Sequence, residues 1–232
     1  MKKSKNNKNS LQRLTMLAIF TAIILLMSFT PLGYLRFGAI EITLIMIPVA
    51  VGAIITGPTG GLFLGIMFGL TSFFVGLSSP VVLMLIDYSP VINTVLIFIW
   101  LVTPRALMGL LVSLIFKAVS KIDKTRTVSF IIASASAAIL NTLLYITFMF
   151  ITFGFNKDFL ALFGAESIFA VIIGLLTFNA LVEVVVSIIV GGGISKALSI
   201  YLPGGNNHSY VSNNVKINSE TTDTSIDKGD TL

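Results

Sequence analysis

Long apolar runs alternate with short polar or turn-forming segments along most of this chain. A helix needs about 20 apolar residues to cross the hydrocarbon core of a bilayer, with a working range of about 17 to 25. Runs that approach or exceed this length cover residues 14–29, 42–56, 60–77, part of 91–118, 127–153 and 167–195. The pattern therefore predicts an all-α membrane protein with six transmembrane helices.

The run 91–118 allows two interpretations. As one helix its 28 residues would extend about 42 Å, which exceeds the apolar core of about 30 Å. Pro104 lacks an N–H and clashes with the preceding turn, so the fourth helix could begin near it. A re-entrant segment would then precede the helix, and Arg105 would lie near the outer face. The alternative is one tilted, kinked helix.

Composition supports lipid as the solvent of most of the chain. Hydrophobic residues make up 55% and charged residues 11%, and the mean hydropathy is +0.98. A soluble domain carries about 25% charged residues, so these values argue against a soluble enzyme or a nucleic-acid-binding domain. The chain has no cysteine, which excludes disulfides and thiolate metal sites.

The basic residues indicate the orientation in the membrane. With both termini cytoplasmic, twelve Lys and Arg residues fall on inner segments and two, Arg36 and Lys157, on outer loops. This asymmetry follows the positive-inside rule. Residues 1–13 then form a basic cytoplasmic N-terminus, 14–200 the transmembrane domain and 201–232 a polar tail, which its composition predicts to be disordered. No cleavage site follows the first apolar run, so we expect a retained helix.

Motifs for catalysis are missing from the sequence. It contains no P-loop and no zinc-protease or nucleophile-elbow motif. With one histidine and no cysteine, the usual metal and nucleophile sets are excluded, so we expect no metal or cofactor. Binding or transport is therefore favoured over an enzymatic role.

Small residues recur at helical spacing in two places. Ala18 and Ala22 share one face of the first helix, and Gly61, Gly65 and Gly69 share one face of the third. Such patterns allow helices to approach closely. The sequence favours internal packing for the glycines, and for the alanines internal packing is the simplest interpretation.

Polar residues at membrane depth are the candidate site. Ionisable residues there are costly and are functional-site hypotheses by default. Arg105 could bind a carboxylate, reach the outer interface, or pair with Glu183. Asn179 and Glu183 share one face of the sixth helix, as do Asn141 and Tyr145 on the fifth. Together they predict a polar pocket that opens outward, although interhelical hydrogen bonding is an alternative.

Turn-rich outer segments could cover that pocket. Residues 30–38 contain Tyr34, which is a further candidate for substrate binding. Turn-forming residues also occur at 78–80 and 87–90. Loops of this kind often gate binding sites, so residues 30–38 are a lid candidate.

Several segments together resemble the substrate-binding S component of energy-coupling factor (ECF) vitamin transporters, and the pantothenate-type branch in particular. They are the basic N-terminus, Ala18-x-x-x-Ala22, the runs 42–61 and 68–72, Thr103 to Gly109, Asn141-Thr142 and Asn179-x-x-x-Glu183. The resemblance spans residues 12–200. Met46 stands where this branch often has histidine, and residues 179–183 lack its usual proline.

The resemblance implies a high-affinity vitamin-binding subunit of an importer in the cytoplasmic membrane of a bacterium. Its partners would be a transmembrane T protein, contacted through Ala18 and Ala22, and two ABC-type ATPases that supply the energy. The absence of a P-loop fits this division of labour. Arg105 would bind the pantothenate carboxylate. Asn141, Tyr145, Asn179 and Glu183 would bind its amide and hydroxyl groups.

Other functions stay open on the sequence. The ligand could be another vitamin or a small metabolite. From different classes of protein, an intramembrane enzyme acting on lipid and a structural membrane subunit are the alternatives. Uptake that requires a T protein and ATPases would distinguish a substrate-binding S component from an intramembrane enzyme and from a structural subunit.

Overall fold

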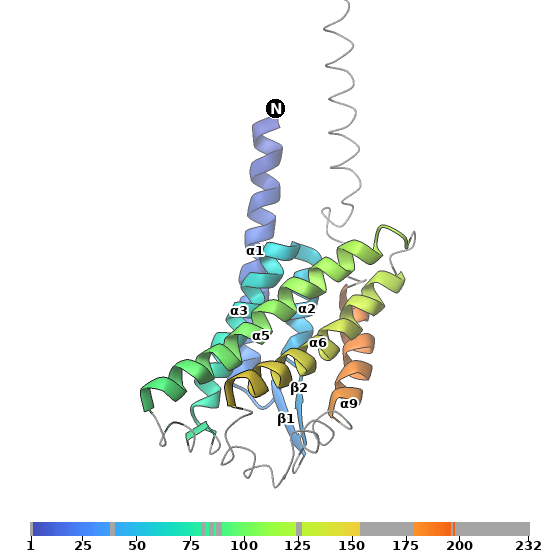
Figure 1. The fold of residues 1–232 in the computed structure, drawn as a ribbon. Coiled ribbons are helices and arrows are strands. Elements are labelled where there is room, and N and C mark those ends of the chain that lie inside the picture. Colours follow the sequence, from blue (N-terminus) through green and yellow to red (C-terminus); the bar gives the residue numbers. More distant parts are fainter. Residues whose placement is uncertain are drawn as a thin grey trace, which may run out of the picture. The chain divides into compact units, whose positions relative to one another are not determined.

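The computed structural model describes residues 2–37, 40–79, 82, 83, 86, 90–123, 127–153, 179–195 and 197. Its elements, in chain order, are α1 (Lys2–Ser28), β1 (Tyr34–Phe37), β2 (Ile40–Thr43), α2 (Met46–Thr56), α3 (Pro58–Gly76), α5 (Pro90–Val119), α6 (Thr127–Phe153), α9 (Asn179–Val186) and the π-helix η1 (Ser187–Gly192) (Figure 1). The first part of the predicted sixth helix, Lys157 and the tail 201–232 lie outside the described residues.

Among the described residues, four helices are long and apolar enough to cross a membrane: α1 over Leu11–Ser28, α3, α5 and α6. Two shorter apolar helices cover Met46–Thr56 and Leu181–Ser195. Large hydrophobic side chains stay exposed along the long helices, among them Ile92 on α5 and Leu143 on α6. Such surfaces suit lipid rather than water, and the fold is that of a helical, multi-pass membrane protein.

Helix α2 forms the centre of the described bundle. Ten of its eleven residues are buried, and it contacts α1, α3, α5 and α6. A helix that is apolar on all sides is expected in such a position. The sequence predicted a helix over 42–56, but α2 begins at Met46, and Pro48 lies in its first turn, where a proline is tolerated.

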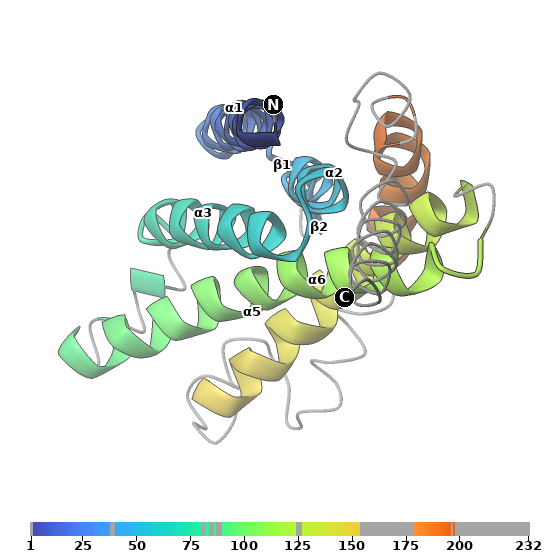
Figure 2. The ribbon, with the colours of Figure 1, turned by 90° about the horizontal axis from the view of Figure 1, so that it is seen from above.

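Gly61, Gly65 and Gly69 form a glycine ridge on α3 that packs directly on the backbone of α5. A Cβ added to Gly61 would collide with the carbonyl oxygen of Gly109, and one added to Gly65 with that of Arg105. At Gly69 it would lie 2.7 Å from the Cα of Val102. The predicted role of these glycines in internal packing is therefore confirmed. In Figure 2, α3 lies between α1 and α5.

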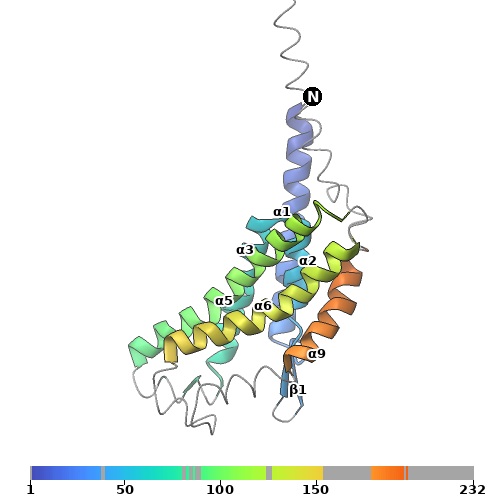
Figure 3. The ribbon, with the colours of Figure 1, turned by 45° about the vertical axis from the view of Figure 1, so that its right-hand side comes forward.

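Helix α5 is continuous from Pro90 to Val119, with Pro104 inside it. The interpretation that a new helix begins near Pro104, after a re-entrant segment, is therefore wrong. The alternative of a single long helix holds. Neighbouring helices shield the backbone that a proline leaves unpaired in a membrane helix. Arg105 consequently lies near the middle of α5 and not at its outer end. Figure 3 shows α5 and α6 side by side.

Two short strands form a hairpin that the sequence pattern did not predict. β1 and β2 pair antiparallel, with Tyr34 opposite Thr43. The hairpin lies at the end of the bundle opposite the N-terminus of α1 (Figure 1). Its first strand, Tyr34–Phe37, lies within the segment 30–38 that the sequence analysis treated as a lid candidate. The hairpin is an addition to the predicted all-α fold.

The close contact of α3 with α5 predicts a stability effect. Gly65→Ala places a methyl group against the carbonyl of Arg105, so the helices must separate. We expect a loss of about 1–3 kcal/mol, the usual cost of overpacking, visible as a lower thermal midpoint in detergent. Gly193→Ala is the control, because its added Cβ would meet no described atom within 4 Å beyond its chain neighbours and its own helix backbone. Equal midpoints for the two variants would contradict the packing argument.

Candidate functional site

Arg105 is the central residue of the candidate site. Its side chain is 8% exposed, and its backbone is fixed by the contact with Gly65. The guanidinium carbon lies 4.8 Å from the ring centroid of Tyr145 on α6 and 5.5 Å from that of Phe68 on α3. A cation over an aromatic face is attracted by the ring quadrupole, most strongly away from water. Three helices therefore meet at this charge.

The guanidinium group keeps donors that the described protein groups do not satisfy. Its Nε and Nη1 atoms are buried and have no hydrogen-bond partner among the described residues. Tyr145, Tyr34 and Glu183 interact with its charge electrostatically. A buried charge is costly unless it is paired and hydrogen-bonded. The arrangement is chemically suited to an acceptor, above all an anion such as a carboxylate.

Tyr145 is held in place by the aromatic cluster beside it. The indole N–H of Trp100 donates to the carbonyl oxygen of Tyr145 at 3.2 Å, and the two rings are 5.1 Å apart. Trp100 also contacts Phe153 edge to face. Asn141 is buried and lies one helical turn before Tyr145 on α6. The two residues therefore share one helix face, as the sequence predicts.

The hairpin joins two helices around the site. The Tyr34 hydroxyl lies 3.1 Å from the Ser72 hydroxyl on α3. At the other strand, the Thr43 N–H donates to Oε1 of Glu183 on α9 at 2.9 Å. Glu183 is 4% exposed, so this bond is well shielded from water. Asn179 begins α9, and its side chain lies outside what the structure describes.

The structure brings together most of the residues predicted from the sequence. The charge of Arg105 interacts electrostatically with three of the other predicted residues, Tyr145, Tyr34 and Glu183. The sequence analysis missed Phe68, Trp100, Ser72 and Thr43. Phe68 had a usable signal, since it lies three residues after Gly65 and so faces the same neighbour as the glycine ridge. Among the described residues, no group of three or more acidic or histidine side chains could hold a metal ion.

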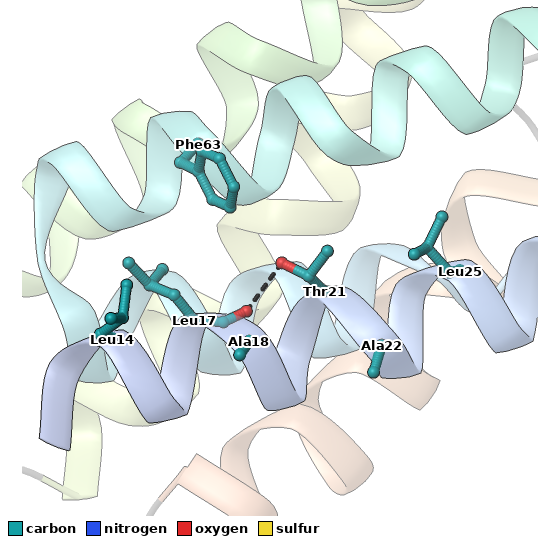
Figure 4. A pocket seen from close by; sticks show the side chains of 7 residues that line it. All are labelled: Leu14, Leu17, Ala18, Thr21, Ala22, Leu25 and Phe63. Carbon is teal, nitrogen blue, oxygen red and sulfur yellow. Dashed lines mark hydrogen bonds between the residues drawn. The ribbon is translucent and has the colours of Figure 1, made fainter. Parts of the chain in front are cut away.

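Ala18 and Ala22 lie away from Arg105, on an apolar groove of about 470 Å³. Both alanines are exposed. The groove runs along α1 and is closed on one side by Phe63 of α3 (Figure 4). Its lining residues are Leu14, Leu17, Ala18, Thr21, Ala22, Leu25 and Phe63. Within the part of the chain that the structure describes, the two alanines are therefore not buried against a neighbouring helix.

The fold and the buried cation define a multi-pass membrane protein with a site suited to binding. Comparison with known proteins is consistent with this class. The family model described as "ECF transporter, substrate-specific component" matches residues 12–191. The chain is 28% identical over 199 residues to the pantothenate transporter PanT of Leuconostoc mesenteroides, covering 83% of this chain and 94% of that protein. It is 30% identical over 208 residues to the pantothenic acid transporter PanT of Lactococcus lactis, covering 86% and 97%.

The chain belongs to the family of substrate-specific components of ECF transporters. It is therefore a transporter component and not an enzyme, as the sequence analysis predicted.

The bond between Glu183 and the hairpin predicts a local effect. Glu183→Ala leaves the Thr43 N–H without its charged acceptor. Hydrogen bonds to charged groups contribute about 1.5–3 kcal/mol, so we expect amide exchange at residues 40–43 to accelerate by about tenfold or more. Glu183→Gln keeps an acceptor oxygen and should accelerate exchange less. Mass spectrometry of exchanged peptides measures both, and equal protection in wild type and Glu183→Ala would contradict the role of this bond.

Proposed function

We propose that this protein captures pantothenate outside the cell and delivers it to a T protein driven by two ABC-type ATPases. It does so in the cytoplasmic membrane of a bacterium, with six transmembrane helices and both termini in the cytoplasm. The family membership and the names of the two relatives support this function. The charge asymmetry of the loops supports the orientation.

The observation that carries the proposal is the buried guanidinium of Arg105, whose Nε and Nη1 atoms have no hydrogen-bond partner among the described residues. Pantothenate has one carboxylate, one amide and two hydroxyl groups. Its carboxylate supplies the negative charge and acceptor oxygens that Nε and Nη1 lack among the described residues. An arginine in an apolar bundle gains most from such a ligand because little water competes.

The remaining polar residues suit the other groups of the ligand. Tyr145 and Tyr34 carry hydroxyls close enough to interact with the charge of Arg105. Asn141 offers an amide on the same helix face as Tyr145, and we assign Asn179 and Glu183 to the hydroxyl groups of pantothenate. With the N-terminus inside, the hairpin end of the bundle faces outward (Figure 1), so ligand enters from that end.

The groove on α1 is the proposed contact for the T protein. Ala18 and Ala22 present small, exposed side chains along it, and small residues let a partner helix approach closely in lipid. The groove is apolar, as a helix–helix contact inside a membrane requires.

Calorimetry on the purified chain with a vitamin panel tests the ligand. We expect tight 1:1 binding of pantothenate. Arg105→Ala should weaken it by at least about thirtyfold, because truncating one partner of a buried charge pair costs about 2–5 kcal/mol. Arg13→Ala is the control, since Arg13 bonds to Thr59 on a different part of the bundle and should leave affinity unchanged.

The outcomes separate the parts of this proposal. Unchanged affinity in Arg105→Ala would remove Arg105 from the site. Tight binding of a different vitamin would keep the transporter and reject pantothenate. Absence of binding by folded wild-type protein to every vitamin tested would contradict the proposed function.

Blocking the α1 groove should abolish transport without affecting capture. Ala22→Trp fills the groove, so we expect the T protein and ATPases to stop co-purifying with this chain, while pantothenate affinity in detergent stays unchanged. Ile139→Trp is the matched control, because Ile139 is 46% exposed on α6, away from the groove. Full complex formation by Ala22→Trp would reject this face as the contact.

A further inference from the structure

We propose that Phe68 is a positioning residue that makes the site selective for a carboxylate. It acts by holding the guanidinium of Arg105 while leaving that group's N–H donors available to ligand. The inference rests on the proposed binding of pantothenate at Arg105.

The geometry gives Arg105 two aromatic neighbours on two different helices. Phe68 extends from α3 and Tyr145 from α6, and both rings lie within 6 Å of the guanidinium carbon. Both helices pack on α5, which carries Arg105. Because the rings belong to separate helices, movement of Arg105 away from one ring is limited by packing against the other helix.

A ring stabilises the cation without accepting a conventional hydrogen bond in the plane of the guanidinium. An acidic side chain of the protein in the place of this ring would instead accept hydrogen bonds from the N–H donors. The charge of Arg105 would then be paired within the protein, with no donor left for a ligand. Phe68 has no polar atom, so its attraction is to the charge alone. The buried Nε and Nη1 atoms accordingly stay without partners among the described residues. Phe68 thus stabilises the charge and preserves the donors that a ligand carboxylate needs.

The position of Phe68 is itself tightly fixed. Its side chain is 0% exposed, and the neighbouring Gly65 and Gly69 hold α3 against the α5 backbone. Its carbonyl accepts a hydrogen bond from the Thr71 hydroxyl at 2.9 Å, and Thr71 accepts one from Ser28 of α1 at 2.9 Å. The ring is therefore a rigid part of the site, which a positioning residue requires.

Two ligands that differ only at the carboxylate separate a positioning role from a general packing role. The probes are pantothenate and its alcohol analogue, in which CH₂OH replaces the carboxylate. Calorimetry gives the ratio of the two dissociation constants for wild type, Phe68→Leu and Phe68→Met. Both substitutions keep an apolar side chain of comparable length and remove the ring. Phe73→Leu is the matched control, because Phe73 lies on the same helix but contacts Phe74 and Phe98.

We expect wild type to prefer pantothenate strongly and the Phe68 variants to lose about tenfold of that preference, as expected for a desolvated cation–π contact. Phe73→Leu should keep the wild-type ratio of dissociation constants. Phe68→Tyr retains an aromatic ring and should also keep a ratio close to that of wild type. Equal weakening of both ligands in the Phe68 variants would show a packing role only and overturn the inference. A wild type without preference for the carboxylate would instead contradict pantothenate binding at Arg105, and with it this inference.

Discussion

The burial of one positive charge in an apolar bundle is the constraint on which the site depends. Arg105 lies near the middle of a helix whose surroundings are hydrophobic, and two of its nitrogens lack partners among the described residues. A position of this kind costs stability unless something stabilises the charge. Two aromatic rings contribute part of that stabilisation, and an acceptor from a ligand would contribute the rest. A binding protein can retain such a site because the ligand completes it.

Close helix packing is what makes this arrangement possible. The glycines of α3 let its backbone meet that of α5 at Arg105 itself. Without this approach Phe68 would lie too far from the charge. Small residues therefore have two opposite uses in this chain. On α3 the glycines pack against α5 inside the bundle, whereas on α1 the alanines stay exposed along a groove. The two patterns nevertheless have the same spacing in the sequence.

The length of the apolar runs predicted the long helices well, because an apolar run of membrane length has few alternatives. The run 127–153 matches α6 to the residue. The hairpin was missed because its strands have four residues each, too few for an alternating pattern to stand out. The effect of Pro104 was ambiguous because neighbouring helices decide whether a membrane helix tolerates a proline. Arg105 and Tyr145 were identifiable because polar groups are rare in such helices, whereas Phe68 is one of 18 phenylalanines and only its contact distinguishes it.

In the proposed function, capture and delivery use separate surfaces with opposite chemistry. The candidate ligand site is polar, buried and built from α3, α5, α6, α9 and the hairpin, while the groove on α1 is apolar and exposed. Helix α1 contacts α2 and α3, and the described groups that act on Arg105 come from other elements. A partner bound along α1 would therefore leave the ligand's contacts intact. In that proposal, release would require a change that reaches Arg105 through α3, because this helix carries Phe63 at the groove and Phe68 beside Arg105. The rigid glycine contact between α3 and α5 means that such a change must move these two helices together, which favours rigid-body motion of the bundle over local rearrangement within it.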